Sequence, residues 1–137
     1  MYVLSTPNNK SKTLQIGNQK YEKDILVKVH IKKNNSKSIY KCMRNSRSDY
    51  PILNLAISKD DNNFKICVGA RPQRATIAKE ASEFISNNIL NEENILKASE
   101  IACEELVFGS NMRASKEYRK AICKSLVKSA LMEVSSC

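Results

Sequence analysis

The residues best suited to chemistry lie in one short polar segment of this sequence. Lys41 is followed by Arg44, Arg47 and Asp49, just before a strongly apolar stretch that starts at Ile52. A cation fixed at a strand end can donate a hydrogen bond to a carbonyl oxygen and stabilise negative charge that develops on a bound group. Alternatively, Arg47 and Asp49 pair with each other and only fix the loop. The residues alone leave both interpretations open.

Other kinds of active site lack the residues they need. The sequence has only three glycines, so no glycine-rich turn can bring backbone amides against a pyrophosphate. His30 is the only histidine, and the five cysteines are widely spaced without a C-x-x-C pair, which argues against a zinc or iron–sulfur site. We therefore expect reduced thiols that mostly fill the core, and no self-contained active site.

The positive charge of the chain is concentrated in its first part. The formal net charge is +9; residues 1–50 hold eleven Lys and Arg against three acids, whereas residues 51–137 hold twelve against eleven. An electropositive half can face phosphates, an acidic partner subunit or nucleic acid, or it can be a solvated lysine-rich surface. No RNP-like aromatic pair, GXXG loop or zinc knuckle accompanies the basic residues, which disfavours nucleic acid.

Strand patterns come first along the chain. Residues 1–20 are polar and weakly patterned, which indicates a leader or linker ahead of one domain at 21–137. Apolar residues in alternation or in short runs then predict four strands, at about 25–31, 38–43, 52–58 and 64–69.

Helix patterns follow after Pro72. They predict one helix that ends near Asn88, a second capped by Asn91 and a third capped by Ser115. The apolar positions expected in the common core are Ile77, Phe84, Ile101, Tyr118, Ile122 and Leu126. Strands followed by helices predict an α+β fold, an antiparallel sheet of about four strands with three helices packed on one face.

The sequence gives no sign of membrane insertion. No stretch approaches twenty apolar residues, and the first residues contain no signal-peptide core. We expect a soluble, cytoplasmic protein.

Three motifs, in their order and spacing, carry a family resemblance. They are Tyr40-Lys41 with Arg44 and Arg47-Ser48-Asp49, the junction Gly69-Ala70-Arg71-Pro72, and Arg113 followed by Ser115-Lys116-Glu117-Tyr118-Arg119 at the start of an amphipathic helix. Together they resemble the C-terminal domain of the FAD-binding (medium) subunit of the xanthine dehydrogenase and carbon monoxide dehydrogenase family, the molybdenum hydroxylases. The resemblance covers about residues 22–134.

The resemblance implies a role in electron transfer to FAD. The domain would form part of the wall of the flavin pocket and of the subunit interface, with Lys41, Arg47 and Asp49 beside the flavin. Upstream FAD-binding domains, absent from this chain, would hold the FAD diphosphate, so the chain alone would neither bind FAD nor be catalytic. Its partners would be those domains and the iron–sulfur and molybdenum subunits.

The alternative function is a small basic nucleic-acid-binding α+β module, supported by the net charge of +8 on residues 1–50. A salt titration of DNA binding distinguishes the two hypotheses, because the affinity of a phosphate-binding module falls steeply with salt.

Overall fold

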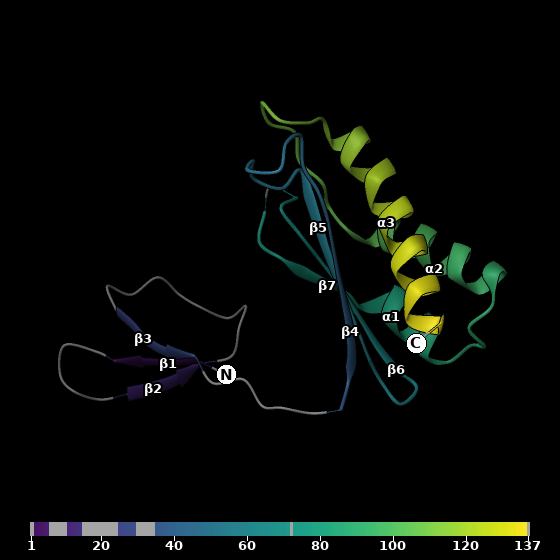
Figure 1. The fold of residues 1–137 in the computed structure, drawn as a ribbon, viewed down its shortest axis with the longest axis horizontal. Helices are drawn as coiled ribbons and strands as arrows, with labels where there is room; N and C mark the ends of the chain where they lie inside the picture. Colours follow the sequence, from purple (N-terminus) through teal and green to yellow (C-terminus); the bar gives the residue numbers. More distant parts are fainter. Residues whose placement is uncertain (1, 6–10, 15–24, 30–34, 72, 137) are drawn as a thin grey trace. The chain divides into compact units, whose positions relative to one another are not determined.

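The computed structural model describes residues 2–5, 11–14, 25–29, 35–71 and 73–136. The chain divides into two compact units, Met1–Asn34 and Asn35–Cys137 (Figure 1). This division falls after Asn34, whereas the sequence patterns placed a boundary after residue 20.

The N-terminal unit contains a three-stranded antiparallel sheet. Its strands are β1 (Tyr2–Ser5), β2 (Ser11–Leu14) and β3 (Ile25–Val29), in the order β2-β1-β3. Two of these strands lie in the segment expected to be a leader or linker. The strand predicted at 25–31 does form in part, but it pairs with β1 instead of joining the main sheet. Period-two alternation marks a strand without specifying its partner.

The C-terminal unit is built on a four-stranded antiparallel sheet. It consists of β4 (Lys37–Met43), β5 (Leu53–Asp60), β6 (Asn63–Gly69) and β7 (Thr76–Ala78), in the order β4-β5-β6-β7. The tight turn between β5 and β6 places Asp61 at a φ of 52°, a left-handed conformation that Asp tolerates. The predicted strand count is confirmed, but β7 takes the fourth place where the sequence patterns indicated the start of a helix.

Three helices follow the sheet and cover one of its faces (Figure 1). They are α1 (Lys79–Ser86), α2 (Glu92–Glu105) and α3 (Lys116–Ser136). The predicted caps are confirmed: the Asn91 side chain accepts a hydrogen bond from the Asn94 N–H at 2.8 Å, and the Ser115 hydroxyl accepts one from the Tyr118 N–H at 3.2 Å. The α+β fold expected from the sequence is thus confirmed.

The core lies between the helices and alternate residues of β5 and β6. Those strand residues are Leu53, Leu55, Ile57, Phe64, Ile66 and Val68. Of the residues predicted for the core, Ile122 is buried. Phe84, Ile101 and Leu126 are partly buried and pack against the core.

The core prediction is wrong for two residues: Ile77 is 43% exposed and Tyr118 is 49% exposed. Ile77 lies in β7 opposite Cys67, and its neighbour Ala78 takes the buried position. At the start of α3 the buried position is taken by Arg119, the residue after Tyr118, and further along the helix Ile122 is buried as predicted.

Within the part of the chain that the structure describes, no helix is both long and apolar enough to cross a membrane.

Candidate functional site

Three connecting segments meet at one end of the four-stranded sheet. The antiparallel register places Met43 opposite Leu53, Asn54 opposite Gly69 and Val68 opposite Thr76. The segments that connect these strands therefore lie at the same end of the sheet. We call residues 44–52, 73–76 and 107–115, together with Arg71, the loop cluster. The Ile52 N–H bonds the Met43 carbonyl at 2.8 Å and the Gly109 N–H bonds the Arg71 carbonyl at 2.7 Å, which joins these segments to the sheet and to one another.

The buried Arg119 side chain holds the loop cluster through several hydrogen bonds. Its side chain is 1% exposed. The guanidinium donates to the carbonyls of Ile52 (3.0 Å), Gly109 (2.7 Å) and Ala114 (2.8 Å) and to Asn111 Oδ1 (2.6 Å). Burial, with a smaller effect of the Arg113 charge, lowers the pKa of Arg119 from its ordinary value. A guanidinium remains charged at neutral pH even so, and backbone dipoles compensate its burial.

Arg71 holds the neighbouring segments together in the same way. It is also buried, and it donates to the Arg74 carbonyl, to the Thr76 hydroxyl at 2.7 Å and to the Val107 carbonyl. These bonds tie the β6–β7 connection to the segment after α2. Two buried cations therefore hold all three parts of the loop cluster.

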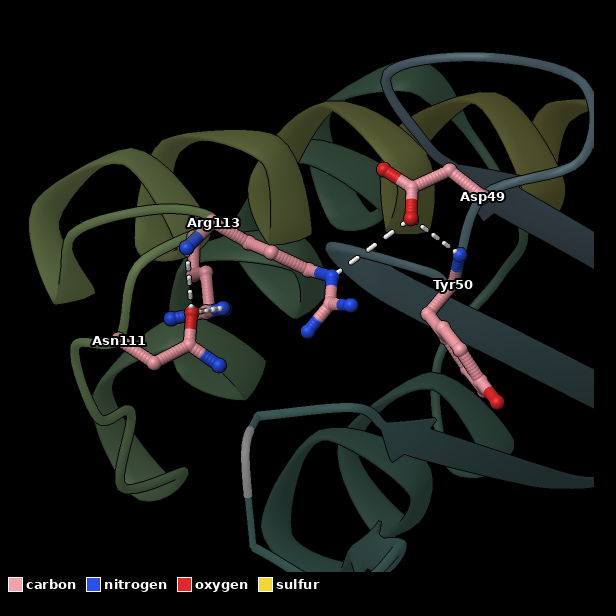
Figure 2. Close-up of polar contacts among 5 residues, drawn as sticks. Asp49, Tyr50, Asn111 and Arg113 are labelled. Carbon is pink, nitrogen blue, oxygen red and sulfur yellow. Dashed lines mark hydrogen bonds and ion pairs between the residues drawn. The ribbon is translucent and has the colours of Figure 1, made fainter.

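An ion pair closes the outer side of the loop cluster (Figure 2). Arg113 Nε lies 3.7 Å from Asp49 Oδ1, and the Arg113 guanidinium lies 5.2 Å from the centre of the Tyr50 ring. Asp49 Oδ1 also accepts a hydrogen bond from the Tyr50 N–H at 2.7 Å, and Asn111 Oδ1 accepts one from the Arg113 N–H at 3.0 Å. The loop after β4 is thereby held to the loop before α3.

The structure separates the three predicted site residues. Asp49 belongs to the loop cluster and pairs with Arg113, not with Arg47 as the alternative interpretation had it. Arg47 lies on the same loop with an exposed side chain. Lys41 lies within β4, two residues before its end, and its ammonium pairs with Glu133 of α3 at 2.6 Å. The Lys41 side chain is therefore on the sheet face that the helices cover.

Arg44 makes hydrogen bonds to nearby residues of its own segment. It donates to Cys42 Sγ at 3.2 and 3.3 Å and to the Arg47 carbonyl at 3.2 Å. Within the described residues, the Arg47 guanidinium has no hydrogen bond or ion pair, so it is the basic group of this loop that is free to meet a ligand.

Arg71, Arg119 and Asn111 were not among the predicted site residues. A signal for Arg119 was present, because it lies three and four residues before Ile122 and Cys123 and so falls on the buried side of α3. A charged residue on a buried helix stripe indicates bonds to groups that packing brings close. Nothing local indicated which carbonyls those would be.

The loop cluster offers cations and amides, not metal ligands or a phosphate cradle. No group of three or more His, Cys, Asp or Glu residues suited to a metal occurs among the described residues. Gly69 serves internal packing, because a Cβ at this position would lie 2.3 Å from Asn54 Oδ1. Among the described residues, the loop after β4 presents the exposed Arg47 guanidinium to whatever lies against it.

Comparison with known proteins gives a match to one family. Residues 38–134 match the family described as CO dehydrogenase flavoprotein C-terminal domain. Comparison with curated protein sequences gave no match.

Solved structures share the fold. Quinoline 2-oxidoreductase from Pseudomonas putida 86 aligns with a TM-score of 0.80 at 18% identity. Carbon monoxide dehydrogenase from Hydrogenophaga pseudoflava, in a form lacking the Mo-pyranopterin moiety of its cofactor, gives 0.78 at 18%, and the reconstituted enzyme from Oligotropha carboxidovorans gives 0.76 at 15%. Each alignment covers 98% of this chain and 52% of the matched chain, so this chain spans about half the length of those proteins.

Proposed function

Because this chain belongs to the family of CO dehydrogenase flavoprotein C-terminal domains, we propose that it forms one wall of a flavin pocket and part of a subunit interface in a molybdenum hydroxylase. Its cofactor in the complete subunit is FAD. Its partners are upstream FAD-binding domains and the iron–sulfur and molybdenum subunits, in the cytoplasm. The chain contributes to electron transfer in that assembly and is not catalytic alone.

The observation that carries this proposal is the anchored loop after β4, on which the Arg47 guanidinium has no partner among the residues that the structure describes. The loop closes through the Ile52–Met43 bond and is anchored by Arg119 below and Arg113 beside it. Rigid support is what a cofactor-facing group requires, because a cation stabilises developing charge best when it does not have to reorganise. Arg47 is presented on that support with its guanidinium exposed.

The three residues Lys41, Arg47 and Asp49 take different roles in this proposal. Arg47 faces the flavin edge and supplies positive charge to it. Asp49 keeps the loop in place through Arg113, at 3.7 Å. Lys41 lies beside the pocket, but Glu133 at 2.6 Å offsets its charge, so its influence on the flavin is weaker than that of Arg47.

FAD would bring two-electron and one-electron transfer chemistry to this site. The residues of this chain fit one part of that cofactor: an exposed guanidinium suits the polar edge of the ring. They do not fit the diphosphate, since the Asn54 side chain occupies the space beside Gly69 and the sequence holds only three glycines. The diphosphate therefore belongs to the upstream domains.

The test is the flavin midpoint potential in a subunit assembled from this chain and upstream FAD-binding domains. Arg47→Met should lower the potential, because a nearby cation favours the reduced, more negative flavin. Lys41→Met should lower it less. Lys128→Met is the matched control, since Lys128 pairs with Glu92 on the helix surface, and it should leave the potential unchanged.

Two results would contradict this assignment. An unchanged potential in Arg47→Met with a large shift in Lys41→Met would mean that Lys41 is the residue facing the flavin. No shift in either variant, with FAD still bound, would remove this loop from the pocket wall.

A further inference from the structure

Small side chains are buried on both α2 and α3, two helices that pack against each other. They are Ala98, Ala102 and Cys103 of α2 and Cys123 and Ala130 of α3. Because the distance between packed helices depends on the side chains at the contact, small residues favour a close approach. Two of these buried small residues are cysteines, one on each helix.

The Cys103 thiol lies against α3 one helical turn before Cys123. Cys103 Sγ donates to the Lys120 carbonyl of α3 at 3.4 Å, and Lys120 precedes Cys123 by three residues. Each thiol is the largest influence on the pKa of the other. Both cysteines are free thiols in this structure. Two buried thiols placed in this way on packed helices provide the proximity that the narrow geometry of a disulfide requires.

Access to the two thiols is unequal. Cys103 is 4% exposed and lines two surface hollows, of about 450 and 210 Å³. Cys123 is fully buried and lines neither hollow. A small solute can therefore reach Cys103 first, with Cys123 directly behind it.

The surroundings also separate the thiols chemically. Interaction with the Cys123 thiol lowers the pKa of Cys103; burial opposes this effect, and the Lys120 and Lys124 charges assist it. The same interaction, followed by burial, raises the pKa of Cys123.

Carboxylates also surround this site. Glu104 acts against the lowering of the Cys103 pKa. Glu100, which pairs with Lys124 at 2.9 Å, and Glu117 complete the charged lining of the larger hollow. Cys103 is the thiol that ionises more readily, and thiolates are the reactive form.

We propose that Cys103 and Cys123 form a redox modification site, in which a hydroperoxide converts the two thiols into a reversible disulfide between α2 and α3. The geometry makes Cys103 the attacking thiol and Cys123 the resolving one. This site is separate from the loop cluster and does not depend on the proposed function.

The reaction has two steps. The Cys103 thiolate attacks one peroxide oxygen, so that an S–O bond forms, the O–O bond breaks, and hydroxide or alkoxide leaves and takes up a proton. The Cys123 thiol then loses its proton and its sulfur attacks the Cys103 sulfur, so that the S–S bond forms and the S–O bond breaks to release water. Two thiols lose two electrons, and the peroxide is reduced.

The test uses the full chain with Cys42, Cys67 and Cys137 each replaced by serine, which leaves only this pair. Hydrogen peroxide in mildly alkaline buffer should remove both thiols, and dithiothreitol should restore them. Peptide mass spectrometry should find Cys103 and Cys123 joined within one chain. The same cross-linked peptide should appear in the unsubstituted protein, so the result does not depend on the variant folding.

Two further substitutions, each added to that background, test the order of attack. With Cys123→Ala, Cys103 should stop at the sulfenic acid, which dimedone traps. With Cys103→Ala, Cys123 should lose its thiol at least about tenfold more slowly than the intact pair does.

The proposal is overturned if oxidised native protein, variant and unsubstituted alike, contains no Cys103–Cys123 bond, or if the bond forms only in denaturant. Equal reaction rates for Cys123 alone and for the intact pair would overturn the assigned roles.

Discussion

At the scale of single residues, Arg71 and Arg119 show how buried cations organise a backbone, and among the described residues neither forms an ion pair with a carboxylate. A guanidinium presents five N–H donors in a planar fork, so one side chain can bond several carbonyls at once. Arg119 uses this to join the start of β5 to the loop before α3. The Asp49–Arg113 pair, whose side chains are about one-third exposed, has a weaker hold on the same loops.

Replacing Arg119 by Met should therefore destabilise the fold strongly. The carbonyls of Ile52, Gly109 and Ala114 would each lose a donor in a dry environment. We expect a loss of about 3–5 kcal/mol in the free energy of unfolding, measured by urea denaturation. Arg113→Met is the control and should cost no more than about 1 kcal/mol. Similar losses in both variants would show that Arg119 is not the main anchor.

At the scale of elements, α3 is the helix that connects the core to the loop cluster. Its buried side comprises Arg119, Ile122, Cys123, Val127, Ala130, Leu131 and Val134. The first of these bonds the loops and the others pack on β4, β5 and α2. The rotation of this helix about its axis therefore decides both the packing and the position of the Arg119 guanidinium.

Truncation along α3 should reveal this rotation. Leu131→Ala removes a fully buried side chain and should cost about 2–5 kcal/mol in the free energy of unfolding. Tyr118→Ala, at a half-exposed position on the same helix, should cost less than about 1 kcal/mol. Denaturant melts of the two variants measure the difference, and a larger loss for Tyr118→Ala would mean that the helix packs in the other orientation.

At the scale of the whole molecule, the chain spans about half the length of the chains that share its fold. The family model starts at residue 38, close to the beginning of the unit Asn35–Cys137, whereas the structural alignments extend over 98% of the chain. The structural alignments therefore include residues of the N-terminal unit that the family model does not match.

The purified chain should fold cooperatively and be colourless. A surface that contacts only the flavin ring binds FAD too weakly to retain it. The Asn54 side chain already occupies the space beside Gly69 that a phosphate would need. Visible absorbance after gel filtration with added FAD measures retention; circular dichroism melts serve as the control for folding. A stoichiometric yellow complex would mean that the diphosphate site lies within this chain.

Local features of the fold were predictable from the sequence. Asn91 and Ser115 cap their helices because a capping side chain needs only the N–H group three residues later. The strands β4, β5 and β6 follow patterns of a few neighbouring residues. The order of strands before helices was enough for the fold class, and the motifs around Lys41, Gly69 and Ser115 were enough for the family.

The tertiary structure alone decided which of these parts meet. β7 took the place in the four-stranded sheet that was expected for β3, and β3 pairs with β1, because strand pairing joins residues far apart in sequence. A turn of about 100° per residue separates Tyr118 from Arg119 on α3, so packing had to choose between their two faces. The contacts of Lys41 with Glu133, Asp49 with Arg113 and Cys103 with Lys120 likewise join segments that no local pattern relates. Periodicity extends over a few residues, whereas these contacts depend on how whole helices and strands pack.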